Sequence, residues 1–140
     1  MALTDEFFNA MHEYDSAVQE VQKKRKFFDG LLGMGNHPAN AACHELMDQR
    51  VAELCRQAAE SADPGEKAAL IRAVFQAEPS WEGPEYARLM LTAIQRHTLE
   101  VIPGLEPSER EAIKEWYLET YPRHRRLPVQ EQVLKALKGK

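Results

Sequence analysis

The residue types that could do chemistry gather in one short stretch, residues 33–48, which reads GMGNHPANAACHELMD. Imidazole and carboxylate groups are ligands that zinc uses in proteins. His44 and Asp48 are four residues apart, so they share a helix face on which a carboxylate can orient a neutral imidazole. With His37 in the preceding loop, we take His37, His44 and Asp48 as candidate metal ligands. The alternative is that His37 caps the helix and the other two form an exposed pair.

The same stretch could bind an anion, because a glycine-rich loop leading into a helix presents backbone N–H groups to a phosphate or carboxylate. The candidate ligand residues are Gly33, Gly35, Asn36, His37 and Asn40. Nucleotide-binding fingerprints place a strand before the glycines, whereas a helix is expected here. We therefore favour the alternative that the glycines only end the preceding helix.

The chain carries no recognisable catalytic signature. The spacings Glu-x-x-His, His-Glu-x-x-His and Gly-x-Ser-x-Gly do not occur in the sequence. His97 lies on the apolar side of an expected helix over residues 84–101, where an isolated histidine is usually a hydrogen-bonded core residue. The sequence therefore leaves the catalytic residues unknown and leans against an enzyme without deciding it, and we expect no cofactor.

The elements that must position these residues are all helical, since every periodic segment follows a helical repeat and Pro or Gly separates the segments. Thr4 is the expected N-cap of the first helix, and Asp63 followed by Pro64 and Glu66 marks the start of the third. The expected helices cover residues 5–28, 38–61, 64–78, 84–101, 107–121 and a short segment from 128. This pattern predicts an all-α bundle of five to six helices in a single domain of residues 1–140, with no sheet.

The first helix carries an apolar stripe with steps of four and three residues, as in a coiled-coil seam. A helix of this length offers more apolar stripe than a small bundle is expected to cover, so residues 1–29 could serve as a dimer arm. Trp81, in the loop after the third helix, is either an anchor onto the core or an interface residue. The candidate partner-binding residues are Phe7, Met11, Tyr14, Val18, Val21 and Trp81.

The charge of the chain is unevenly distributed. Residues 123–140 carry six basic side chains and one acid, a net of +5, so the remainder must carry −9 to give the overall −4. Arg123, Arg125 and Arg126 are therefore the candidate polyanion-binding residues. The sequence pI of about 5.8 argues against nucleic acid as the partner, because domains that bind it are typically strongly basic.

The two cysteines and the apolar runs bear on the compartment. Cys43 and Cys55 lie in one expected helix, about 18 Å apart along its axis, which is too far for a disulfide. Free thiols fit a reducing cytoplasm. The first residues lack the basic start and apolar core of a signal peptide, and no apolar run is long enough to span a bilayer. We expect a soluble cytoplasmic protein.

Together these observations predict a protein-binding or regulatory module that binds a protein partner or forms a homodimer through its first helix. The first alternative is a protein that binds a small ligand or metal at the glycine-rich loop and the start of the second helix, a site that could also serve an enzyme. The second alternative is a protein that binds nucleic acid through residues 123–140.

Overall fold

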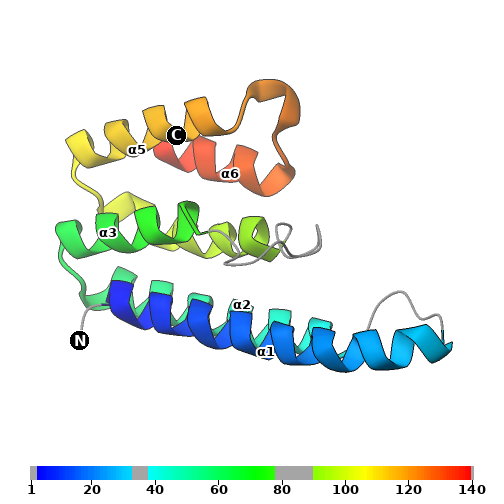
Figure 1. The fold of residues 1–140 in the computed structure, drawn as a ribbon. Coiled ribbons are helices and arrows are strands. Elements are labelled where there is room, and N and C mark those ends of the chain that lie inside the picture. Colours follow the sequence, from blue (N-terminus) through cyan, green and yellow to red (C-terminus); the bar gives the residue numbers. More distant parts are fainter. Residues whose placement is uncertain (1–2, 33–37, 78–89, 140) are drawn as a thin grey trace.

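The computed structural model describes residues 3–32, 38–77 and 90–139, with side chains described for 3–20, 43–77 and 90–139. These residues form an all-α bundle, as the sequence predicts, and contain no strand. Figure 1 shows three stacked layers: α1 with α2, then α3 with the segment that follows residue 90, then α5 with α6.

The longest layer is an antiparallel hairpin of α1 (Leu3–Leu32) and α2 (Pro38–Ser61). The sequence places the start of the first helix at Thr4 as N-cap, but Thr4 lies inside α1. The helix also continues through Gly30, since one glycine in a helix costs only about 1 kcal/mol relative to alanine. In contrast, α2 begins at Pro38 as predicted, because a helix's first N–H has no intrahelical partner for proline to remove.

The start of α3 (Pro64–Phe75) confirms the predicted capping signal. The backbone N–H of Glu66 donates to the Asp63 side chain at 2.8 Å, and Pro64 occupies the first helical position. This bond satisfies one of the unpaired N–H groups at the helix start. The helix ends at Phe75, earlier than residue 78, where the sequence predicts its end.

The described part of the predicted helix 84–101 is only partly α-helical. Residues 90–93 are α-helical, but the chain then tightens into the 3-10 helices η1 (Ile94–Glu100) and η2 (Ile102–Gly104). Within η1 the Thr98 hydroxyl donates to the Gln95 carbonyl oxygen at 2.7 Å. A threonine side chain that bonds the preceding turn competes with regular α-helical bonding.

The last layer consists of α5 (Pro107–Thr120), the short 3-10 turn η3 (Arg123–Arg125) and α6 (Pro128–Leu137). Both α-helices begin with proline where the sequence predicts. Gln130 accepts a bond from the Leu127 N–H at 2.8 Å, which secures the start of α6. After α6, Gly139 adopts a φ of +80°, the left-handed conformation that commonly ends a helix.

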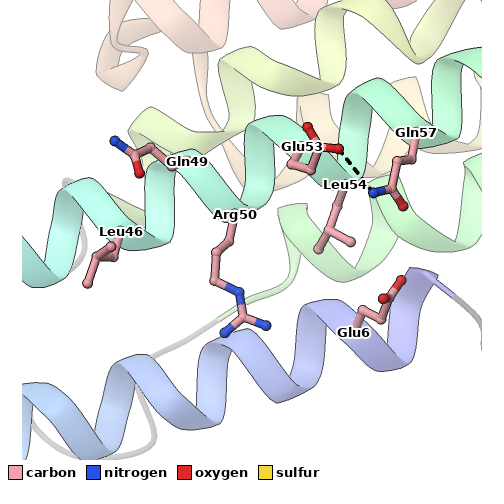
Figure 2. Close-up of a pocket in the computed structure, with 7 residues that line it drawn as sticks. All are labelled: Glu6, Leu46, Gln49, Arg50, Glu53, Leu54 and Gln57. Atoms are coloured by element: carbon pink, nitrogen blue, oxygen red, sulfur yellow. Dashed lines mark hydrogen bonds between the residues drawn. The ribbon is translucent and has the colours of Figure 1, made fainter.

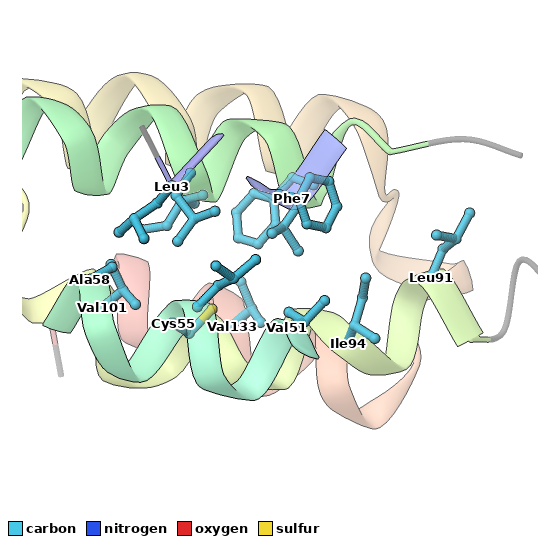
Figure 3. Close-up of a cluster of buried hydrophobic side chains, with 14 of the residues drawn as sticks. Leu3, Phe7, Val51, Cys55, Ala58, Leu91, Ile94, Val101 and Val133 are labelled. Carbon is cyan, nitrogen blue, oxygen red and sulfur yellow. The ribbon is translucent and has the colours of Figure 1, made fainter. Parts of the chain in front are cut away.

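The core joins all three layers. Figure 3 shows Phe7 of α1 in one buried cluster with Val51 and Cys55 of α2. Other buried members come from the later segments: Leu91, Ile94, Val101 and Val133. Burying a side chain of this size contributes about 1.5–3 kcal/mol relative to leaving it in water. The apolar stripe of α1 is therefore one wall of the chain's own core.

Candidate functional site

The predicted anion-binding loop cannot be placed. Gly33, Gly35, Asn36 and His37 lie outside the described residues, and Asn40 lies within α2 with its side chain outside the described set. The anion-binding hypothesis therefore stays a prediction.

The other two candidate metal ligands take part in packing between elements. Asp48 accepts hydrogen bonds from η1: its Oδ1 lies 2.9 Å from His97 Nε2, and its Oδ2 lies 2.8 Å from Arg96 Nη2. The ring of His44 packs against Tyr14 of α1, with centroids 5.7 Å apart, and burial lowers the pKa of its imidazole below the ordinary 6.5. Within the described residues, no three His, Cys, Asp or Glu side chains are placed to hold a metal.

Most of the predicted partner-binding stripe is buried by the chain itself. Phe7, Met11, Tyr14 and Val18 are at most 8% exposed, because α2 and α3 pack on this side of α1. Val21 and Trp81 fall outside the described side chains. The four described residues belong to the core, so these four side chains are not available to a partner in this structure.

The predicted polyanion-binding arginines have different surroundings. Arg126 is used internally: its Nε donates to the Tyr121 carbonyl oxygen at 2.9 Å, and its Nη1 lies 3.3 Å from Glu131 Oε1. Its side chain is only 10% exposed. Arg123 and Arg125 are exposed on η3. The basic segment therefore presents fewer free cations than its sequence indicates.

A buried polar chain, which the sequence analysis missed, links η1 to α5. The Tyr117 hydroxyl donates to Gln95 Oε1 at 2.7 Å, and Gln95 Nε2 donates to the Tyr121 hydroxyl at 3.1 Å. Burial raises the pKa of Tyr117 far above its ordinary value of 10. The signal available in the sequence was the position of Gln95, directly after Ile94 and three residues before Thr98. Both of these neighbours are fully buried in the structure. Gln95 and Tyr117 are both buried, so these hydrogen bonds fix how η1 docks against α5.

A groove of about 300 Å³ runs between α1 and α2 on the outer side of the hairpin (Figure 2). It is lined by Glu6 of α1 and by Leu46, Gln49, Arg50, Glu53, Leu54 and Gln57 of α2. Leu54 is only 7% exposed, whereas Leu46 is 62% exposed. Figure 2 shows Leu46 and Arg50 pointing from α2 toward the α1 side. A large apolar side chain therefore stands open at one end of the groove.

The charges along the groove are largely paired within the chain. Arg50 forms an ion pair with Glu13 across the two helices. Hydrogen bonds from Arg56 and then Gln57 hold the pKa of Glu53 below its usual range, so this carboxylate stays ionised. Glu6 has no ion pair among the described residues. The groove thus combines an exposed leucine with one carboxylate, that of Glu6, which is not paired among the described residues.

No helix among the described residues has the length and apolar character needed to cross a membrane. Comparisons of the chain with models of known protein families, with curated proteins and with solved structures find no match.

Proposed function

We propose that this chain is a helical protein-binding module and that the groove between α1 and α2 is its docking surface. The observation that carries the proposal is Leu46, 62% exposed at the end of a groove whose floor is the buried Leu54. Helix-in-groove recognition uses this arrangement, in which apolar anchors enter a groove between helices and polar groups surround them.

The burial pattern supports this choice of surface. Of the four large apolar residues that are exposed among the described residues, Leu46 is the most exposed and lies in the groove. Leu118, 37% exposed, belongs to α5, which Figure 1 shows in the layer farthest from α1 and α2, and it does not line this groove. Single exposed apolar residues are common on proteins, so the coincidence of Leu46 with a groove matters more than its exposure.

The two alternative functions remain predictions. Small-ligand or metal binding depends mainly on residues outside the described set. Nucleic-acid binding depends on Arg123 and Arg125, which are exposed, but not on Arg126, whose guanidinium is engaged within the chain. A cytoplasmic location is likewise a proposal.

Site-specific photo-crosslinking tests the proposed docking surface. A benzoylphenylalanine at Gln49, in the groove, should give a discrete adduct in cells of the chain's own host. The matched control carries the crosslinker at Glu115, an exposed position on α5. Leu46→Asp should remove the adduct, because a carboxylate replaces the apolar anchor.

Either of two results would argue against the groove. Equal adducts from positions 49 and 115 would indicate non-specific collision. An adduct at position 49 that survives Leu46→Asp would show that the anchor contributes nothing. Thermal melts of each variant should match the wild type, since all the changed positions are solvent-exposed.

A further inference from the structure

The described residues include three half-buried arginines: Arg72, Arg110 and Arg126. Two of them pair with a carboxylate. Arg72 Nη2 lies 2.7 Å from an oxygen of Glu109, and Arg126 Nη1 lies 3.3 Å from one of Glu131. Arg110 forms no ion pair with a described residue, although it lies directly after Glu109 in the chain. The positive charge of this half-buried side chain is therefore not neutralised by a direct partner.

The Arg110 guanidinium extends from the first turn of α5 to η2 and to the end of α6. Its Nη2 donates to the Pro103 carbonyl oxygen at 3.3 Å, and its Nη1 lies 3.4 Å from the point where a Cβ of Gly139 would stand. The Nε is buried and has no hydrogen-bond partner among the described residues. Buried donors without a partner are uncommon, and an ion or water is one explanation for them. The packed stem, rather than a strong partner, holds this guanidinium in place.

A second cation reaches η2 from α3. The end of the Lys67 side chain lies against Gly104, where a Cβ would overlap the ammonium group and would lie 2.9 Å from Cδ. Gly104 does not have the positive φ that favours glycine, so its backbone would also accept alanine. The close approach of Lys67 is thus the reason that this position suits glycine. The Lys67 ammonium has no hydrogen bond or ion pair within the described part of the chain.

The two cations occupy equivalent places in two matching motifs. Residues 63–67 read Asp-Pro-Gly-Glu-Lys, and residues 106–110 read Glu-Pro-Ser-Glu-Arg. In each motif the proline is the first residue of a helix, and the cation follows three positions later. Figure 1 shows α3 and α5 beginning at the same end of the bundle. The helix starts therefore bring both cations to η2, which lies between them in the chain.

The separation of the two cations suits one bridging anion. Both cationic groups lie next to the peptide unit that joins Pro103 to Gly104, so they are within about 10 Å of each other. A phosphate that accepts one charge-assisted bond of about 2.8 Å from each side bridges donors roughly 8 Å apart. The flexible four-carbon stem of lysine can close the remaining distance.

We propose that Lys67 and Arg110 bind a phosphate group at this end of the bundle, in a site that we call the η2 site (Lys67, Gly104, Arg110 and Gly139). Arginine supplies a planar fork of donors that matches phosphate oxygens, and lysine supplies a compact point charge. The phosphate is either free or carried as the monoester of a small molecule. The η2 site shares no residue with the groove between α1 and α2, so it does not depend on the proposed function.

Nuclear magnetic resonance of the full-length chain, labelled with nitrogen-15 and titrated with sodium phosphate at constant ionic strength, tests the η2 site. We expect saturable shifts of the Gly104 and Gly139 amide signals, with a dissociation constant of about 1 mM because only two partly exposed side chains hold the anion. Sodium acetate should give no saturable shift of these signals. Melting temperatures do not replace this measurement, since phosphate stabilises folded proteins non-specifically.

Three substitutions separate the roles of the residues in the η2 site. Lys67→Gln and Arg110→Gln should each weaken phosphate binding about tenfold, because each removes a charge-assisted bond. Gly104→Ala keeps both charges but should weaken binding a few-fold, since the new Cβ displaces the Lys67 side chain. The matched control is Arg125→Gln on η3, which removes one exposed cation and should leave binding unchanged.

A second titration with glycerol phosphate distinguishes the two sources of the phosphate group. Binding of glycerol phosphate at least as tight as that of inorganic phosphate would identify a monoester as the ligand. Saturation by inorganic phosphate alone would identify the free anion.

Several results would overturn the η2 site. Shifts at Gly104 and Gly139 that grow linearly without saturating would show no binding, and equal saturation by acetate would exclude a preference for phosphate. Because Arg110 also contacts Pro103, Arg110→Gln could lower stability, so Lys67→Gln is the decisive variant: unchanged phosphate binding by it would refute the site. An equal loss in Arg125→Gln would indicate a general effect of charge. None of these outcomes bears on the groove.

Discussion

Asp48 of α2 and His97 of η1 form a direct contact between two layers of the bundle, with Asp48 Oδ1 and His97 Nε2 2.9 Å apart. The imidazole N–H donates to the carboxylate, whose other oxygen accepts from Arg96. Both side chains are partly shielded from water, at 29% and 16% exposed. A residue that the sequence suggested as a metal ligand therefore holds η1 against the α1–α2 hairpin.

Removing this carboxylate should destabilise the fold. Asp48→Ala deletes the acceptor of two side chains and leaves His97 partly buried without it, so we expect a loss of about 1–2 kcal/mol in the free energy of unfolding. Urea denaturation followed by circular dichroism measures it. The control is Glu60→Ala, which breaks an exposed pair with Arg56 and should cost less than about 0.5 kcal/mol. Equal losses would contradict the interlayer role.

Tyr117 should be more important to stability than Tyr121. Tyr117→Phe leaves the buried Gln95 carbonyl without its donor at 2.7 Å, at an expected cost of about 1–3 kcal/mol. Tyr121→Phe removes a longer and less buried bond and should cost less. Chemical denaturation of both variants gives the comparison, and the reverse order would refute it.

Alkaline pH should unfold the protein through the same residue. Burial raises the pKa of Tyr117 above its ordinary value of 10, so the folded state holds the phenol proton more tightly than the unfolded state. The stability contributed by this group is present below pH 10 and is lost as pH rises above it. Tyrosine absorbance at 295 nm should show one phenol that ionises only as the far-ultraviolet signal is lost. Tyr117→Phe should abolish that coupled step.

Mild acid should lower stability through His44. Burial depresses its pKa below 6.5, so the unfolded chain takes up the proton more readily than the fold does. The contribution of His44 is therefore present above pH 6.5 and lost as pH falls below it. Melting temperatures at pH 7.5 and 5.5 should differ more for the wild type than for His44→Gln. The control is His124→Gln on exposed η3, which should retain the wild-type difference.

The two thiols should react at different rates. Burial raises the pKa of Cys55 to about 12, and Cys55 is fully buried, whereas Cys43 is partly exposed. Because the thiolate is the reactive form, a disulfide reagent should label Cys43 first and Cys55 only on unfolding. Cys43→Ser should remove the fast phase; a fast phase that persists would show that Cys55 is accessible.

The sequence by itself determined the helical class, the start of α2 at Pro38, and the cap at Asp63. These features depend on local chemistry: helical periodicity, a proline without an N–H, and a side chain that reaches a backbone group three residues on. It also identified the apolar stripe of α1, although not what covers that stripe.

Only the tertiary structure decided which residues meet. Asp48 bonds a histidine 49 positions away, Arg126 turns inward to the Tyr121 carbonyl, and the stripe of α1 is buried by α2 and α3. The 3-10 geometry of η1 and the exposure of Leu46 were likewise set by packing. Helical spacing specifies the face on which a side chain lies, but the layer against that face is set by contacts between residues far apart in the chain.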